Sequence, residues 1–177
     1  MRIETARLIL RPFTMDDAEA MYKNWASDPD VMRYMPYDIC ETLEATRKSI
    51  ENWFGYFNSV GSNAWQAWAI QLKGEVIGTI DFVELDNHAR SAEVGYQLGK
   101  AWWGNGYCTE ALIELANYAF DTEGLNRLWG GFDPRNPASG RVMEKAGFRY
   151  EGTLRHHRLR HGELVDRVIY GMIRSDR

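Results

Sequence analysis

The stretch from residue 67 to residue 121 constrains the fold most, because three strand patterns follow one another there before a long helical pattern begins. "AWAIQL" and "EVIGTIDFVEL" are separated by a Lys-Gly dipeptide, which is typical of a short hairpin turn. After a second turn, "DNHAR", the residues Val94, Tyr96 and Leu98 alternate with polar or small residues, as in a half-buried strand. The centre of the chain is therefore rich in hairpins and lacks the strict strand–helix alternation of a doubly wound fold.

The flanking segments complete a mixed α/β fold, an α+β arrangement with one mixed sheet, in the order βαα-βββ-α-β-α-ββ. Before the central strands, we expect a strand at 6–13, a helix that begins after Thr14, a second helix that begins near Thr42 and a loop at 58–63. After the long helix, which ends at about Asp121, we expect a strand at 126–132, a short helix between Asn136 and Gly147, and strands at 148–154 and 163–173.

Composition limits the class of protein. A chain of 177 residues predicts a single domain, 1–177, and the net charge of −4 argues against a general nucleic-acid surface. No apolar run is long enough to cross a membrane, and the N-terminus lacks the pattern of a secretory signal. Two cysteines, Cys40 and Cys108, are too few for a disulfide framework, and no spacing suggests a metal site. We therefore expect a cytoplasmic protein that binds neither a membrane nor a metal.

The segment "AWWGNGYCTEAL" places two glycines directly before an amphipathic helix. Cys108, Ala111 and Leu115 fall on one helical face, so the loop Gly104-Asn105-Gly106 lies at the helix N-terminus. Free backbone N–H groups and the positive end of the helix dipole favour an anion there, and glycines let a phosphate approach the backbone. An ordinary strand-to-helix turn is the alternative. A dinucleotide fingerprint fits poorly, because Thr109 stands where the third glycine would be.

The short helix in "DPRNPASGRVMEKAGF" places Ser139 within an apolar arc. On a helical wheel, Ala138, Val142 and Met143 bracket Ser139, so its side chain is predicted to face inward. The hydroxyl would then either bond to a carbonyl of its own helix or donate to a ligand.

Together these motifs resemble the GNAT superfamily of acyl-CoA-dependent N-acetyltransferases, and above all its Rim-type, ribosomal-protein N-acetyltransferase branch. The resemblance covers nearly the whole chain. It rests on the segments "TARLILRPF", "DPDVMRYMP", "AEVGYQL", "WWGNGYCTEAL" and "NPASGRVMEKAGFRYEGTLR".

The resemblance implies that the strand 93–98 splays from the strand 126–132 and that the pantetheine arm of acetyl-CoA lies in the gap. Val94 and Tyr96 would bind that arm through their backbones, Asn136 would touch it, and Ser139 would lie near the thioester sulfur as the acid. The pyrophosphate would rest on the backbone N–H groups of Gly104, Asn105, Gly106, Tyr107 and Cys108.

One residue departs from the family pattern, and the role of general base has no obvious residue. Ala101 stands where the family usually has Gln or Arg, so one phosphate contact is missing or is made by backbone. No general-base carboxylate is obvious. Glu93 is the leading candidate, with a solvent-facing strand carboxylate as the alternative reading, and His156 and His157 also titrate in the relevant range.

The expected reaction is direct attack of an amine on the thioester, with Cys108 in the core and not a nucleophile. Tyr34, Tyr37 and Trp103 are candidates for the amine pocket. The preferred acceptor is the N-terminal α-amino group of a protein or peptide. A small-molecule amine (an antibiotic, polyamine or amino acid) is one alternative, and a non-catalytic acyl-CoA sensor is another. We expect a monomer or a homodimer.

Overall fold

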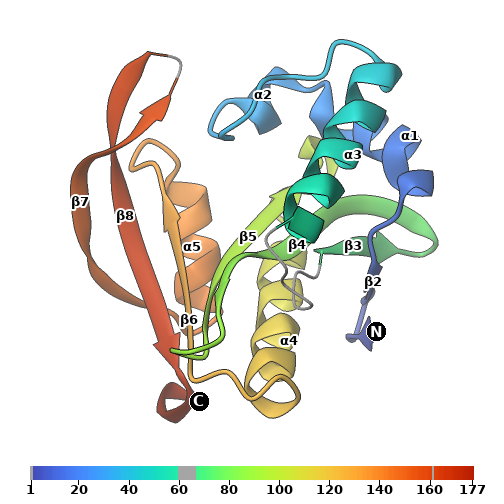
Figure 1. Cartoon of the computed structure of the whole chain (residues 1–177). Coiled ribbons are helices and arrows are strands. Elements are labelled where there is room, and N and C mark those ends of the chain that lie inside the picture. Colours follow the sequence, from blue (N-terminus) through green and yellow to red (C-terminus); the bar gives the residue numbers. More distant parts are fainter. Residues whose placement is uncertain (1, 60–66, 161) are drawn as a thin grey trace.

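The strands of the protein form one curved sheet with helices on both faces (Figure 1). The computed structural model describes residues 2–59, 67–160 and 162–177, and the side chains of 54–59 are not described. The strands are β1 (Ile3–Glu4), β2 (Leu8–Pro12), β3 (Ala67–Leu72), β4 (Glu75–Asp86), β5 (Ser91–Leu98), β6 (Arg127–Phe132), β7 (Arg149–Arg160) and β8 (Glu163–Ile173). The helices are α1 (Ala18–Met21), α2 (Pro29–Met32), α3 (Leu43–Ser59), α4 (Tyr107–Asp121) and α5 (Pro137–Lys145).

The predicted mixed α/β order is confirmed, with local differences. Residues 29–32 form the short helix α2, although "SDPD" was expected only to end a helix. Pro29 occupies the first turn of α2, and the Asp28 side chain accepts a hydrogen bond from the backbone N–H of Asp30, so this segment begins a helix. Strand β7 extends to Arg160, beyond the predicted 148–154. Residues 60–63 of the expected loop lie outside the described residues.

The two faces of the sheet carry different helices. Trp68 and Ile70 of β3 pack in one apolar cluster with α4 and α5, whereas Ala67 and Ala69 of the same strand pack in a second cluster with α1 and α3. Side chains alternate between the faces of a strand, so α4 and α5 cover one face while α1 and α3 cover the other.

Strands β5 and β6 are the only parallel pair among the described strands, and they part early. Their register is Ser91↔Arg127, Ala92↔Leu128 and Glu93↔Trp129, and pairing ends there although β5 continues to Leu98 and β6 to Phe132. On its other edge β5 stays paired with β4 as far as Leu98. The splayed central pair that the family resemblance implies is therefore confirmed, and it leaves a wedge-shaped gap that opens after Glu93.

Helix α4 provides a test of the core on this face. Leu112 is fully buried, and its neighbour Ile113 is 38% exposed on the same helix. We expect Leu112→Ala to lower the free energy of unfolding by about 2–5 kcal/mol, because it removes apolar contacts and leaves a cavity. Ile113→Ala is the control, with an expected loss of about 1 kcal/mol or less. Urea denaturation of both variants measures the difference, and equal losses would contradict the assigned face.

Candidate functional site

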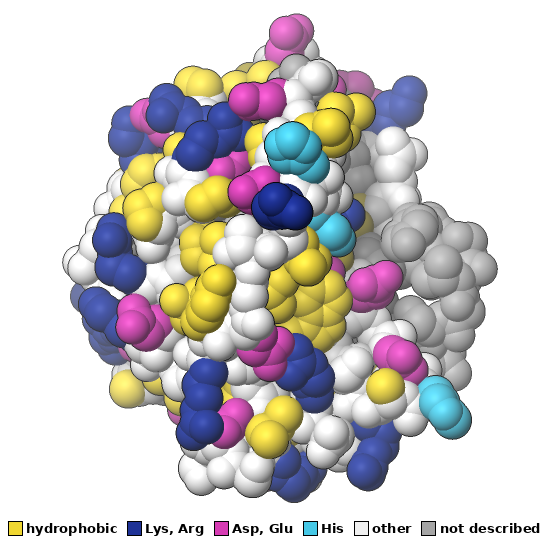
Figure 2. Space-filling view, turned by 90° about the vertical axis from the view of Figure 1, so that its left-hand side faces the viewer, with side chains coloured by type: hydrophobic (Ala, Val, Ile, Leu, Met, Phe, Trp, Pro, Cys, Tyr) yellow, Lys and Arg dark blue, Asp and Glu magenta, His cyan; other side chains and the backbone are white. Residues whose placement is uncertain are grey.

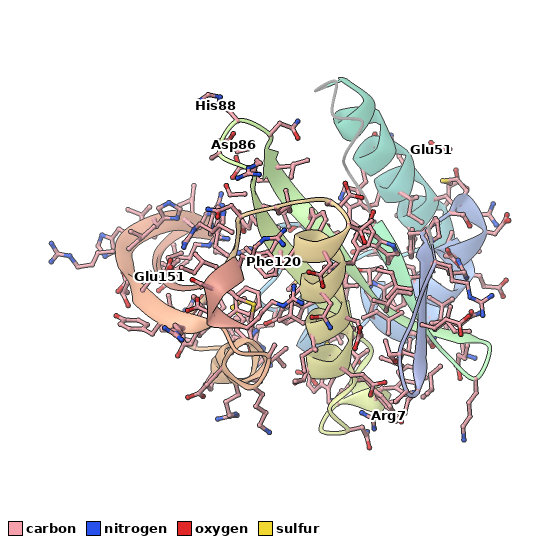
Figure 3. The ribbon with its side chains drawn as sticks, turned by 90° about the horizontal axis from the view of Figure 1, so that it is seen from below. Arg7, Glu51, Asp86, His88, Phe120 and Glu151 are labelled. Carbon is pink, nitrogen blue, oxygen red and sulfur yellow. The ribbon has the colours of Figure 1, made fainter. Side chains whose placement is uncertain are left out.

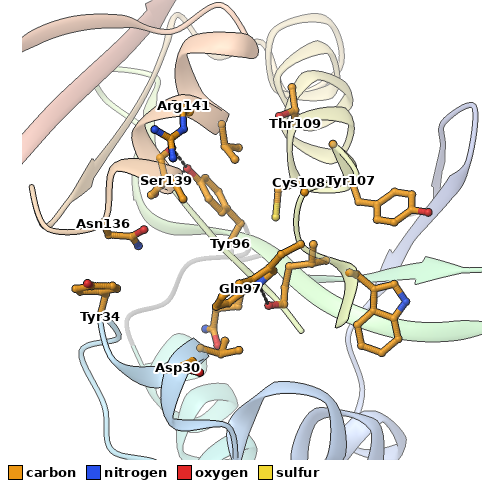
Figure 4. Close-up of a pocket in the computed structure, with 18 of the residues that line it drawn as sticks. Asp30, Tyr34, Tyr96, Gln97, Tyr107, Cys108, Thr109, Asn136, Ser139 and Arg141 are labelled. Atoms are coloured by element: carbon orange, nitrogen blue, oxygen red, sulfur yellow. Dashed lines mark hydrogen bonds between the residues drawn. The ribbon is translucent and has the colours of Figure 1, made fainter. Parts of the chain in front are cut away.

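A cavity of about 660 Å³ lies at the open end of the gap between β5 and β6. It joins the glycine loop, the first turns of α4 and α5, the end of β5, and α2 with the residues that follow it (Figure 4). Of the residues predicted for the site, it is lined by Tyr34, Tyr96, Trp103, Gly104, Gly106, Tyr107, Cys108, Asn136 and Ser139. The positions furthest apart, Tyr34 and Ser139, are separated by more than a hundred residues of sequence.

Four other predicted residues do not line this cavity. The Val94 side chain is buried in the core beneath α4 and α5, so only its backbone is available to the gap. The Asn105 side chain turns back to donate to the carbonyls of Trp102 and Trp103. Tyr37 receives a hydrogen bond from the side-chain amide of Gln97, which does line the cavity. Glu93 points to the opposite face of β5.

The glycine loop has the backbone conformation that its sequence predicts. Gly104 and Gly106 have φ angles of +77° and +78°, in the left-handed region that favours glycine, and Gly106 caps α4. The first intrahelical bond of α4 runs from the N–H of Glu110 to the carbonyl of Gly106, so the preceding N–H groups are free to meet a ligand. Tyr107, Cys108 and Thr109 line the cavity at this turn.

Arg7 of the N-terminal segment holds this loop in place (Figure 3). Its guanidinium donates to the carbonyl oxygen of Asn105 at 3.0 Å and to the Glu110 carboxylate at 2.6 Å, and it lies 4.5 Å from the centre of the Tyr107 ring. Ala101, the departure from the family pattern, is exposed in a short 3-10 helix and does not line the cavity. Basic side chains at the cavity come instead from Arg33, Arg141 and Lys145.

A pair of hydroxyl groups spans the cavity wall between β5 and α5. The Tyr96 hydroxyl donates to the Ser139 carbonyl oxygen at 2.8 Å and lies 2.9 Å from the Ser139 Oγ (Figure 4). With the phenol proton on that carbonyl, the Ser139 hydroxyl can donate to the phenol oxygen. Burial raises the pKa of Tyr96, so the phenol keeps its proton at neutral pH. The side chain of Tyr96 is a site group that the sequence reasoning missed, since only its backbone was assigned.

The prediction of which α5 residues face the core is partly wrong. Gly140, Met143 and Ala146 are buried, whereas Ala138 is exposed and Val142 is half-buried. The helix rotates in this way because Gly140 lies against the Phe132 ring, where a Cβ would come within 2.4 Å of a ring carbon. Ser139 is consequently half-buried at the cavity instead of deep in the core.

The remaining candidate residues, one cysteine and two histidines, lie in different environments. Cys108 is half-buried and lines the cavity, so its predicted place in the core is wrong. Burial raises the pKa of its thiol to about 12, so the thiol stays protonated at neutral pH. His156 and His157 are exposed on β7. Figure 2, which looks onto the side of the molecule with β7 and β8, shows Lys and Arg side chains interspersed with Asp and Glu, so that side presents no continuous basic surface.

Glu93 is buried and carries an ion pair, contrary to its alternative reading as a solvent-facing carboxylate. It is 5% exposed, and Arg167 of β8 donates to its Oε1. Asp81 of β4 is a second buried carboxyl nearby, and neither Asp81 nor Arg167 was singled out from the sequence. A signal was present: Asp81 interrupts the apolar run "VIGTIDFV" in a strand that is otherwise buried, and buried charges usually serve a function or have a partner.

Comparison with known proteins identifies the family. The family model described as an acetyltransferase (GNAT) domain matches residues 7–149. An uncharacterized N-acetyltransferase, YoaA of Bacillus subtilis, is 33% identical over 172 residues, which cover 97% of this chain and 96% of the relative. The [ribosomal protein uS5]-alanine N-acetyltransferase of Escherichia coli is 28% identical over 103 residues, covering 58% and 53%. A crystal structure of a GNAT-family acetyltransferase from Bacillus anthracis superposes with a TM-score of 0.84 at 28% identity, covering 98% of both chains.

The chain therefore belongs to the GNAT acetyltransferase family and is an N-acetyltransferase that uses acetyl-CoA. The residues present fit this cofactor. The gap has unpaired strand edges for an extended amide-bearing arm, the glycine loop offers free N–H groups to phosphates, and basic side chains line the same cavity. Among the described residues, no helix is long and apolar enough to cross a membrane.

The glycine loop can be tested directly. We expect Gly106→Val to weaken CoA binding by about tenfold or more, because a β-branched residue disfavours a positive φ and its side chain would crowd the N–H groups of α4. Isothermal titration with CoA measures the affinity. Gly74→Val is the matched control: Gly74 has a φ of +91° in the β3–β4 hairpin with open space around it, and this hairpin does not line the cavity. Equal losses of affinity in the two variants would contradict the phosphate-loop assignment.

Proposed function

We propose that the protein acetylates the N-terminal α-amino group of a peptide or protein, with acetyl-CoA as donor. The observation that carries this proposal is a second cavity directly beside the first. The main cavity reaches Arg33 and Tyr34, and both residues also line a neighbouring cavity of about 360 Å³. The two cavities therefore adjoin at Arg33 and Tyr34, and we infer that an extended acceptor runs from the hydroxyl pair past these residues into the second cavity.

The second cavity suits a chain with backbone amides better than a compact cation. It is lined by Asp133 and Glu163 as well as by Arg135 and Arg160, so it offers both donors and acceptors. Arg135 pairs with Asp133 at 2.7 Å and with Glu163 at 2.9 Å, which leaves no uncompensated negative field to attract a polyamine or an aminoglycoside. The related enzyme named for an alanine of a ribosomal protein supports the same class of acceptor.

The proposed roles follow from the geometry. Bound acetyl-CoA would supply an activated acetyl thioester, and the backbone of Val94 and Tyr96 at the parted edge of β5 would hold its arm. Ser139 would donate a proton to the departing sulfur, and Tyr96 would orient the Ser139 hydroxyl and resupply that proton.

An α-amine needs only a weak base: making it neutral at pH 7 costs about 1.4 kcal/mol, whereas making a lysine side chain neutral costs about 4.6 kcal/mol. A protein acceptor of ribosomal type would also place the enzyme in the cytoplasm.

The acceptor class is tested by thiol release from acetyl-CoA with matched amines. We expect the highest kcat/KM for a lysine-free peptide with a free N-terminus and no turnover for the same peptide with a formylated N-terminus. The same assay is run with small-molecule amines: spermidine, an aminoglycoside and single amino acids. If one of these exceeds every peptide, the acceptor is a small molecule. If CoA binds but no amine is acetylated, the protein is a sensor.

The hydroxyl pair is tested by removing each hydroxyl in turn. Ser139→Ala and Tyr96→Phe should each lower kcat about 100-fold or more, while the Kd for CoA changes less than about threefold, because proton donation matters only in the reaction. The double variant should lose little beyond either single variant, since the two groups act as one unit. Ser91→Ala removes a hydroxyl from the opposite end of β5 as a control. Unchanged kcat in Ser139→Ala would overturn the acid role.

A further inference from the structure

Three buried charged side chains meet on the sheet face opposite α4 and α5, at the point where β5 and β6 part. Asp81, Glu93 and Arg167 are 7%, 5% and 7% exposed. Ile80, Phe82, Ala92 and Val94 pack into the core under α4 and α5, so the intervening Asp81 and Glu93 point to the other face. Glu93 is the last residue of β5 that pairs with β6. The cluster therefore lies at the vertex of the gap, on the same face of β5 as Gln97, which lines the main cavity.

Within this cluster, Arg167 forms an ion pair with Glu93. Its Nη2 donates to the Glu93 Oε1, its guanidinium lies 5.4 Å from the Trp129 ring centre, and its stem passes over Gly131, where a Cβ would come within 2.4 Å of the Nε. The Nη1 of Arg167 is buried and has no hydrogen-bond partner among the described residues. Such an orphaned donor is costly in a folded protein, which indicates that the cluster is built to face a bound group.

Asp81, by contrast, has no cation of its own. Among the described residues it makes no hydrogen bond or ion pair, although it is as buried as its neighbours. Its register partner on β5 is Gly95, and a Cβ at that position would come within 2.7 Å of the Asp81 Oδ1. Gly95, which looks like a weak point in the strand pattern, thus provides the space in which the Asp81 carboxyl lies against β5.

Burial and one nearby like charge bring the pKa of Asp81 close to neutral pH. Glu93 on β5 is a like charge nearby, and the Arg167 guanidinium of β8 is engaged by Glu93. Tyr37, in the segment after α2, is the other titratable group found to interact with Asp81 among the residues that the structure describes, and it is neutral. Burial, with the Glu93 charge as a smaller contribution, raises the pKa of Asp81 to about 7. A group with a pKa near the working pH is well suited to take up a proton and release it again.

We propose that Asp81, and not Glu93, accepts the proton that the acceptor amine loses, while the Glu93–Arg167 ion pair is a positioning element. This inference rests on the proposed function. The amine nitrogen forms a bond to the acetyl carbon and the carbon–sulfur bond breaks. The amine proton passes to the Asp81 carboxylate, and the sulfur takes its proton from the Ser139 hydroxyl. Asp81 then loses its proton to solvent, and the hydroxyl pair regains one from solvent.

Two measurements on the free protein test the carboxyl without turnover. Carboxyl ¹³C NMR, assigned by the signal that Asp81→Asn removes, should show Asp81 titrating near pH 7. The folded protein binds this proton more tightly than the unfolded chain does, so stability falls as the pH rises from about 4 toward 7. Asp81→Asn should therefore raise the Tm above that of the wild type at pH 8, and the difference should shrink toward pH 4.

The kinetic test compares Asp81→Asn, Glu93→Gln and the control Glu84→Gln, an exposed carboxylate of β4. With the preferred peptide, Asp81→Asn should lower kcat about 100-fold or more and abolish the acid limb of the pH profile of kcat. In Glu93→Gln the acid limb should remain but shift to lower pH. The substitution removes a like charge and frees Arg167 to interact with Asp81, and both changes lower the pKa of Asp81. Glu84→Gln should match the wild type.

The outcomes separate this inference from the proposed function. An active wild type whose Asp81→Asn variant keeps both kcat and the acid limb overturns the role of Asp81 and leaves the acetyltransferase assignment intact. A carboxyl signal that titrates near pH 4 also overturns it. A wild type that binds CoA but acetylates no amine overturns the proposed function, and this inference with it.

Discussion

The early end of pairing between β5 and β6 is the constraint on which the rest of the site depends. Three residue pairs join the strands, and beyond Glu93 the edge of β5 has no strand partner on that side. Exposed strand edges are usually paired or covered, because unpaired N–H and C=O groups are costly. Here the end of β5 lines a cavity that also contains the glycine loop at the N-terminus of α4, and we propose that the two provide an amide-binding edge and a phosphate-binding turn.

The alternation of side chains along β5 divides the chemistry between the two faces of the sheet. Tyr96 points toward α5 and meets Ser139, whereas Glu93 and Gly95 point away from it, toward Asp81 and Arg167. We propose that proton donation to the leaving sulfur and proton removal from the amine take place on opposite faces of this strand.

The sequence predicts the element order and the glycine loop because these depend on local patterns, whereas the splayed strand was expected only from the family resemblance. Alternation, capping and turn chemistry act within a few residues. The orientation of α5 was partly wrong, because the tight contact between Gly140 and Phe132 is a tertiary feature that a helical wheel does not contain. Asp81 and the Tyr96 hydroxyl were missed for the same reason: their partners, Gly95 and Ser139, come from a neighbouring strand and a distant helix. The assigned cofactor and acceptor residues themselves remain predictions.

The central claim is that one cofactor occupies the gap and the glycine loop together. Hydrogen–deuterium exchange of the intact protein with and without CoA tests it most directly. We expect CoA to slow exchange at residues 94–98 of β5 and at 107–109 of α4, and to leave the β3–β4 hairpin unchanged. Protection at only one of the two segments, or at neither while CoA is bound, would contradict it.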